Sequence, residues 1–113
     1  MLYQNRCGYA FLGVHVEKRI GGTSGMKKVV KFGGSSLASA EQFRKVSEII
    51  HADKDRRYVV PSAPGKRGSK DTKVTDMLYD CYSAAGDAEA LTKKIAAIQA
   101  RYQEIIDGLG LEL

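Results

Sequence analysis

The sequence predicts an α/β fold in which a βαβα unit with an incomplete sheet leads into a helical hairpin. Two apolar runs, at residues 29–30 and 58–60, each lead into a loop that contains glycine and then into a helical pattern. Two strands that each end in a glycine-bearing loop opening a helix are typical of a βαβα unit. Two amphipathic segments, at residues 74–85 and from about residue 87 to residue 110, are the predicted helices of the hairpin.

The first strand runs directly into the sequence KFGGSS at residues 31–36. A strand-end lysine, two glycines without Cβ atoms and two hydroxyl groups can surround an anionic group closely, and the N–H groups of the next turn can bind it. This layout indicates a site for a nucleotide triphosphate, and an ordinary surface turn of the same composition is the alternative. The candidate phosphate-binding residues are Lys31, Gly33, Gly34, Ser35 and Ser36.

A helix is expected between the two strands. Ser39 and Gln42 have the spacing of a capping box, in which the serine side chain accepts a hydrogen bond from the third helical N–H group and the glutamine reaches back. Four apolar residues share one face of this helix, which is the periodicity of an amphipathic helix. These residues are Phe43, Val46, Ile49 and Ile50. The chain then returns to the second strand, which ends in the sequence PSAPGKRG at residues 61–68.

Three segments of the chain resemble the aspartokinases, within the amino-acid-kinase superfamily: residues 29–36, residues 59–65 (VVPSAPG) and residues 74–78 (VTDML). The resemblance extends from about Met26 to the end of the chain. It implies an amino-acid-kinase three-layer sandwich, of which this chain carries only the N-terminal part of the catalytic domain. It also implies a cytoplasmic enzyme that phosphorylates L-aspartate to 4-phospho-L-aspartate with ATP and Mg2+, in lysine, threonine and methionine biosynthesis, with homo-oligomerisation left open for the full-length enzyme.

The resemblance also assigns roles to individual residues. Lys31 matches the family lysine that reaches the transferred γ-phosphoryl group, while the glycines and serines after it form the phosphate cradle, and at least one serine is expected to cap the next helix. Ser62 matches a serine beside the amino-acid substrate. Thr75 matches a threonine that helps to hold the substrate carboxylate, and a cap or first-turn residue of the following helix is the alternative.

The connection at residues 66–73 is longer than in the simplest members of the family. Thr72 therefore competes with Thr75 for the contact with substrate. The connection also carries four basic residues, which predict either a basic lip that attracts anionic substrates or an ordinary solvated loop. These residues are Lys66, Arg67, Lys70 and Lys73.

The two C-terminal segments have apolar residues at helical spacing, and the resulting stripes are predicted to belong to the core. The first stripe consists of Val74, Met77, Leu78, Cys81, Tyr82 and Ala85, and Gly86 follows it. The second stripe begins after Asp87 and consists of Leu91, Ile95, Ile98, Tyr102, Ile105, Ile106 and Leu109. Gly108 and Gly110 are predicted to end the second helix.

Residues 1–25 lie outside the resemblance and are interpreted as an atypical N-terminal extension, with residues 26–113 forming the N-terminal part of an aspartokinase catalytic domain. One hypothesis is that translation starts at Met26. A genuine disordered or edge-strand extension is the alternative, and residues 9–16 are the candidate for a third strand. Because complete aspartokinases are several hundred residues long, we expect little or no kinase activity from this chain alone. A truncated non-catalytic partner of a full kinase and a nucleotide-binding module are the competing hypotheses.

Composition narrows the function classes further. The 113 residues are 43% hydrophobic and 27% charged, as in an ordinary globular protein. The formal net charge is +5, but basic and acidic residues are interspersed, so nucleic acid is not an expected partner. No apolar run is long enough to span a membrane. Metal-ligand spacing is missing as well, because Cys7, Cys81, His15 and His51 lie in unrelated contexts.

Overall fold

The computed structural model describes the backbone of residues 14–20 and the whole of residues 27–113. In chain order, the elements of these residues are β1 (Val14–Ile20), β2 (Lys27–Phe32), the 3-10 helix η1 (Gly34–Leu37), α1 (Ala40–His51), β3 (Arg56–Pro61), α2 (Val74–Ser83) and α3 (Ala88–Leu109). The strand predicted at residues 9–16 overlaps β1 at residues 14–16, and residues 9–13 lie outside the described part of the chain. Most of the predicted N-terminal extension also lies outside it.

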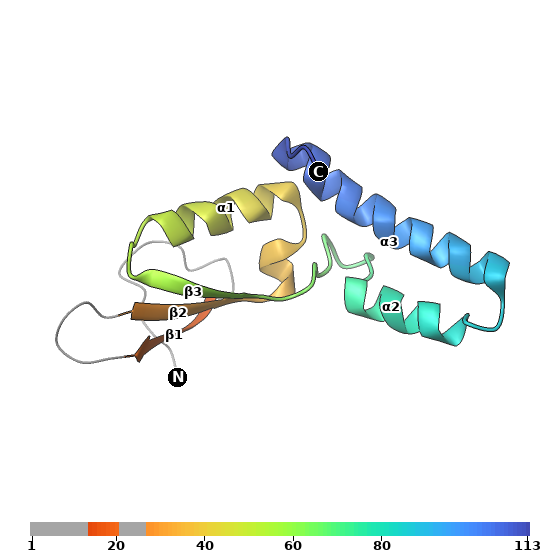
Figure 1. Cartoon of the computed structure of the whole chain (residues 1–113), viewed down its shortest axis with the longest axis horizontal. Coiled ribbons are helices and arrows are strands. Elements are labelled where there is room, and N and C mark those ends of the chain that lie inside the picture. The colour runs from red at the N-terminus through yellow and green to blue at the C-terminus, as the bar shows by residue number, and fades with distance from the viewer. Residues whose placement is uncertain (1–13, 21–26) are drawn as a thin grey trace.

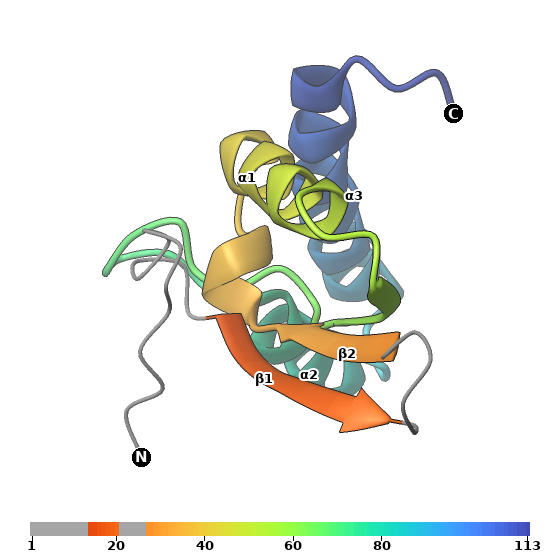
Figure 2. The same ribbon diagram turned by 90° about the vertical axis from the view of Figure 1, so that its left-hand side faces the viewer.

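The described strands form one sheet in the order β1-β2-β3 (Figure 1). β1 pairs with β2 in antiparallel fashion, whereas β2 and β3 are parallel, with Val30 opposite Val59 and Phe32 opposite Pro61. A parallel pair requires a crossover connection, and here η1 and α1 provide it, so that α1 covers one face of the sheet (Figure 2). The predicted α/β class and incomplete sheet are thereby confirmed.

The core lies between β2 and α1. Alternate residues of a strand point to the same face, and Val30 and Phe32 are both fully buried on the face that α1 covers. Lys31 lies between them in the sequence and is exposed, because its side chain belongs to the opposite face. The buried core residues are Val30, Phe32, Leu37, Val46 and Ile49, with Phe43 and Ile50 packed against them.

Side-chain caps begin two of the helices, α1 and α3. The Ser39 hydroxyl accepts a hydrogen bond from the Gln42 backbone N–H at 3.4 Å, which confirms the predicted cap of α1. The capping box is only half formed, because Oε1 of Gln42 is buried without a hydrogen-bond partner. Asp87 caps α3 by accepting from the N–H groups of residues 89 and 90, each at 3.1 Å. The start of α3 was therefore also readable from the sequence.

The end of α3 corrects one prediction. Gly110 ends the helix in the left-handed conformation, with φ of 67°, but Gly108 lies inside the helix. A Cβ atom on Gly108 would come within 2.6 Å of the Cβ atom of Ala40, so this glycine allows α3 to approach the start of α1 closely. The Arg44 guanidinium donates a hydrogen bond to the Gly108 carbonyl at the same contact. Gly108 thus serves helix packing and does not stop the helix.

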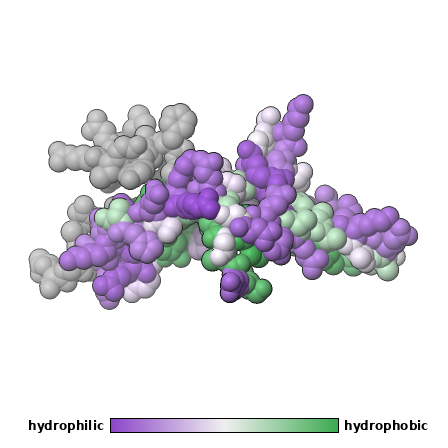
Figure 3. Space-filling view, turned by 90° about the horizontal axis from the view of Figure 1, so that it is seen from above, coloured by the Kyte–Doolittle hydropathy of each residue, from purple (hydrophilic) through white to green (hydrophobic). Residues whose placement is uncertain are grey.

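Helices α2 and α3 form the predicted hairpin beyond the carboxyl ends of β2 and β3 (Figure 1). The hairpin extends the molecule to 57 × 28 × 27 Å. Only one side of each helix finds a partner. Val74 and Ile105 are buried, but four other large residues predicted for the core are exposed by 40% or more of their surface: Leu78, Tyr82, Ile95 and Tyr102. Green apolar residues accordingly reach the surface among the purple polar residues of the hairpin in Figure 3.

The prediction that the hairpin stripes belong to the core was therefore wrong for these four residues. A helical stripe is buried only where a second surface covers it, and the described part of the chain supplies a cover for one end of each stripe. β3 is also incompletely covered within the described part of the chain. Tyr58, Val59 and Val60 are 39–50% exposed along the edge of the described sheet.

Candidate active site

The carboxyl ends of β2 and β3 lie side by side because the two strands are parallel neighbours. The first loop (residues 33–39) follows β2, and the second loop (residues 62–73) follows β3. The Ser62 N–H donates to the Phe32 carbonyl at 3.0 Å, so the second loop leaves the sheet directly beside the first. Ligands of open α/β sheets bind outside the carboxyl ends of the strands. The topology thus places both predicted ligand loops at the edge where a ligand is expected.

The two loops touch through their glycines. The Gly65 N–H donates to the Gly34 carbonyl at 2.8 Å. A Cβ atom on Gly65 would lie 2.5 Å from the carbonyl carbon of Gly34, and one on Gly34 would lie 3.1 Å from the Ala63 carbonyl oxygen. We expected Gly34 to leave room for a ligand, but the space that its missing side chain leaves is filled by the second loop. Gly33 has no atom within 4 Å of its Cβ position and leaves an open side on the first loop.

The two predicted phosphate-binding serines lie in different environments. Ser35 is exposed, whereas Ser36 is 1% exposed within η1. The Ser36 N–H closes a 3-10 turn by donating to the Gly33 carbonyl at 3.1 Å. Neither serine caps α1, since Ser39 occupies that position. The expectation that one of the two would be the helix cap was wrong, because η1 inserts an extra turn before α1 begins.

The remaining predicted site residues are exposed around the same edge. Lys31 is exposed near the end of β2, and Ser62 is exposed at the start of the second loop. Thr75 is the second residue of α2, so it is a first-turn residue and not the cap, which is Lys73. The Val74 N–H donates to the Pro64 carbonyl at 3.1 Å and so docks the start of α2 on the second loop. Thr72 is exposed as well, so both threonines remain candidates for the substrate contact.

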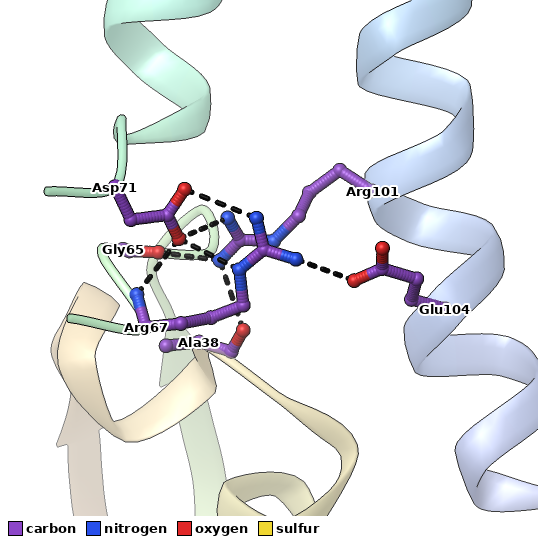
Figure 4. A network of polar contacts seen from close by, with 6 residues as sticks. All are labelled: Ala38, Gly65, Arg67, Asp71, Arg101 and Glu104. Atoms are coloured by element: carbon purple, nitrogen blue, oxygen red, sulfur yellow. Dashed lines mark hydrogen bonds and ion pairs between the residues drawn. The ribbon is translucent and has the colours of Figure 1, made fainter.

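A polar cluster under the second loop was not predicted from the sequence. We call it the Arg101 cluster; Figure 4 shows its members, which are Arg67, Asp71, Arg101 and Glu104. Arg101 extends from α3, is 4% exposed and donates to Asp71 Oδ2 at 2.7 Å. It also donates to two backbone carbonyls, that of Ala38 at 2.9 Å and that of Gly65 at 2.6 Å. One side chain therefore contacts both loops.

Arg67 covers this contact from the solvent side. Its guanidinium donates to both carboxylate oxygens of Asp71, at 2.7 and 3.0 Å, and to Glu104 at 2.5 Å. These hydrogen bonds, assisted by the charge of Arg101, hold the pKa of Asp71 well below its usual range. Arg67 is therefore engaged in the cluster and is not part of a basic lip, whereas Lys66, Lys70 and Lys73 are exposed.

The sequence did contain a signal for the Arg101 cluster. Arg101 interrupts the second apolar stripe, three residues after Ile98 and four residues before Ile105, so it lies on the face of α3 that packs inward. A charged residue on such a face is almost never fully buried unless it is paired. Its partners could not be read from the sequence, because Ala38, Gly65 and Asp71 are between 30 and 63 residues away.

The described residues provide neither a metal-binding cluster nor a membrane-spanning helix. No group of three or more histidine, cysteine, aspartate or glutamate side chains is placed to hold a metal ion there. His51 lies in the last turn of α1, where its Nδ1 is 2.7 Å from the Ser47 carbonyl oxygen. The helices of this part of the chain also include none with the length and apolar character needed to cross a bilayer.

Comparison with known proteins identifies the family. The model of the "Amino acid kinase family" matches residues 26–107. Aspartokinase 3 of Bacillus subtilis (strain 168) is 51% identical over 87 residues, which are 74% of this chain and 18% of that protein. The aspartokinase of Chlamydia pneumoniae is 38% identical over 88 residues, 76% of this chain and 18% of that protein.

A solved structure agrees with the sequence matches. The crystal structure of Clostridium acetobutylicum aspartate kinase superimposes with a TM-score of 0.70 and 46% sequence identity, over 75% of this chain and 20% of that one. The chain thus spans about a fifth of the length of the aspartokinases that it matches.

Proposed function

Because this chain belongs to the amino acid kinase family and, within it, to the aspartokinases, we propose that it forms part of the ATP and aspartate sites of an aspartate kinase. That enzyme transfers the γ-phosphoryl group of ATP to the side-chain carboxylate of L-aspartate, which yields ADP and 4-phospho-L-aspartate for lysine, threonine and methionine biosynthesis. The observation that carries the proposal is the meeting of two glycine-bearing loops at the carboxyl ends of β2 and β3, beside exposed Lys31.

The first loop receives the triphosphate. The Lys31 ammonium offsets negative charge on the γ-phosphoryl oxygens. This stabilisation becomes more important as the phosphoryl group separates from ADP. Gly33 offers an open backbone face, and the Ser35 hydroxyl lies exposed next to it. In this assignment Gly34 and buried Ser36 hold the loop in shape, because the Ser36 N–H closes the 3-10 turn on the Gly33 carbonyl, and the Gly34 N–H is the group assigned to phosphate.

The second loop and the start of α2 receive aspartate. Ser62 lies at the end of β3, and Thr75 lies in the first turn of α2, where the helix dipole favours a carboxylate. Both hydroxyl groups can donate to an anionic oxygen. Mg2+ would enter together with ATP, whose phosphate oxygens would hold it, and it would offset part of the triphosphate charge. The proposed setting is the cytoplasm, where ATP and aspartate are both available.

The proposed reaction belongs to the assembled enzyme. Phosphoryl transfer relies on holding two substrates in line, and this chain spans about a fifth of the aspartokinases that it matches. We therefore expect residues 1–113 by themselves to bind MgATP without turning it over. Homo-oligomerisation is proposed only for the full-length enzyme.

Replacement of Lys31 tests this proposal. A charge-assisted hydrogen bond contributes about 1.5–3 kcal/mol, so Lys31→Ala should weaken MgATP binding by about tenfold to a hundredfold in isothermal titration calorimetry. Lys93→Ala is the matched control, because Lys93 is an exposed lysine on α3 that pairs with Glu89 at 2.7 Å, away from both loops. Equal affinities for the wild-type protein and Lys31→Ala would refute the assigned role, and absence of MgATP binding by the wild-type protein would refute the nucleotide site.

The exposed apolar surfaces favour a second candidate function, that of a non-catalytic partner of a longer aspartokinase. Tyr58 and Val60 on the described edge strand, and Leu78 on α2, are about half exposed. An edge strand with apolar side chains is suited to pair with another polypeptide. Co-purification of the tagged chain with a longer aspartokinase would support this function, and a monomeric chain in the presence of that kinase would exclude it.

A further inference from the structure

The two ligand loops belong to different connections, and few backbone hydrogen bonds of the described residues join them. The sheet fixes only their starting points, through the Ser62 N–H and the Phe32 carbonyl. Farther out, a single backbone hydrogen bond joins Gly65 to Gly34. The second loop then continues for several residues without helix or strand before α2 begins at Val74. The separation of a nucleotide on the first loop from a substrate on the second therefore depends on an additional contact.

Arg101, which extends from α3, supplies that contact. Its guanidinium donates to the Ala38 carbonyl near the end of the first loop, to the Gly65 carbonyl in the middle of the second, and to Asp71 shortly before α2. One acceptor belongs to the first loop and the other two belong to the second loop. The planar guanidinium holds several acceptors in fixed directions, which the single ammonium of lysine cannot do.

The identity of residue 101 is informative, because a buried apolar residue at this position would avoid the cost of burying a charge. The side chain of Arg101 is 3% exposed, and its Nε is buried without a hydrogen-bond partner. A leucine or isoleucine there would continue the apolar stripe without the desolvation cost of a buried charge. What the arginine adds is hydrogen bonds to two loop carbonyls, and loops are the parts of a protein that pack least tightly by themselves.

We propose that Arg101 is a positioning residue of the kinase site, which fixes the first and second loops relative to each other before the ligands bind. Asp71 orients the guanidinium of Arg101, and Arg67 closes the contact toward solvent with Glu104 as its second partner. This inference rests on the proposed function, because it assigns the nucleotide to one loop and aspartate to the other. A preorganised site binds more tightly because less ordering is required on binding.

Amide hydrogen exchange and MgATP titration of the same variants test the inference. In Arg101→Lys we expect exchange to accelerate at least tenfold for the Gly65 amide and its neighbours in the second loop, while the amides of β2 keep their wild-type rates. The dissociation constant for MgATP should rise about tenfold. Arg44→Lys is the matched control: Arg44 also donates to a backbone carbonyl across a helix contact, but it touches neither loop.

Asp71→Asn is a second variant, which keeps the arginine and removes the charge that orients it. It should accelerate exchange in the same loop to a smaller extent, so the test does not depend on Arg101→Lys alone. Unchanged exchange of the second loop in both variants would overturn the inference, as would a uniform rise that includes β2. If the wild-type chain does not bind MgATP, the proposed function fails, and the exchange rates still decide whether Arg101 fixes the loops.

Discussion

In the β2–α1 region, Phe32 and Val46 are 0% and 5% exposed, whereas on the hairpin Leu78 and Tyr82 are 53% and 84% exposed. Both regions contain amphipathic helices, and in each region one helix has a side-chain cap, Ser39 for α1 and Asp87 for α3. In the first region, a helix lies across a strand and each covers the apolar face of the other. The hairpin meets the rest of the molecule mainly near α1 and the second loop. Secondary structure thus follows from local signals in both regions, while burial requires a second surface.

The two regions also differ in the kind of contact that holds their elements together. Side-chain packing closes the β2–α1 core, whereas the buried contact between α3 and the loops is largely polar and centres on Arg101. Packing tolerates changes of pH, but a polar contact depends on the ionisation of its members. The next four predictions compare the two regions, beginning with the change of largest effect.

Phe32→Ala should have the largest effect on stability. Phe32 is fully buried, and truncation of a buried phenylalanine costs about 3–5 kcal/mol through lost burial and the cavity left behind. Urea unfolding followed by circular dichroism measures the change. Phe32→Leu is the control and should cost less than about 1.5 kcal/mol. A loss below 1 kcal/mol for Phe32→Ala would show that the core does not depend on this packing.

Gly65→Ala tests the contact between the two loops. The new methyl group would meet the Gly34 backbone at 2.5–2.8 Å, and we expect a loss of about 1–3 kcal/mol as the loops move apart. Gly68→Ala, in the same loop, is the matched control, because its Cβ position has no atom within 4 Å. Equal unfolding midpoints for the two variants would mean that the loops separate without cost.

The decrease of stability at acidic pH tests the contribution of the Arg101 cluster. Hydrogen bonds from Arg67, followed by one from the Thr72 backbone and by the charge of Arg101, lower the pKa of Asp71 in the folded chain. Such a carboxyl favours folding above its unfolded pKa of about 4, and the contribution disappears as the pH falls through the lower folded value. The urea midpoint of the wild-type protein should therefore decrease more steeply below about pH 5 than that of Asp71→Asn.

The control for this pH series is Asp80→Asn, which changes an exposed carboxylate on α2. It should retain the acid dependence of the wild-type protein. Parallel curves for the wild-type protein and Asp71→Asn would indicate that the cluster does not stabilise the fold.

Tyr82→Ser should have the smallest effect. Tyr82 is 84% exposed on α2, and serine has a similar helix propensity, so the free energy of unfolding should change by less than about 0.5 kcal/mol. The same urea titration measures it. A loss comparable to that of Phe32→Ala would mean that the exposed stripe is covered in solution, for instance by a second molecule.

Several elements of this structure could be predicted because their signals are local. Ser39 caps α1 as its spacing to Gln42 predicts, α3 begins directly after Asp87, and Gly110 ends it. The strand–loop–helix order and the aspartokinase motifs were also readable from contiguous residues, and the family matches confirm them. The placements of Lys31, Ser62 and the first loop at one sheet edge followed from the parallel pairing of β2 and β3.

The sequence by itself determined α1, α2, α3, two parallel strands and the family, because caps, periodicity and motifs depend on residues that are neighbours along the chain. Only the tertiary structure decided that Gly34 and Gly65 face each other, that Gly108 lies against α1, and that a buried Arg101 joins the two loops. It also decided which apolar stripes are buried. These features depend on residues up to 68 positions apart, and their contacts exist only once the chain has folded.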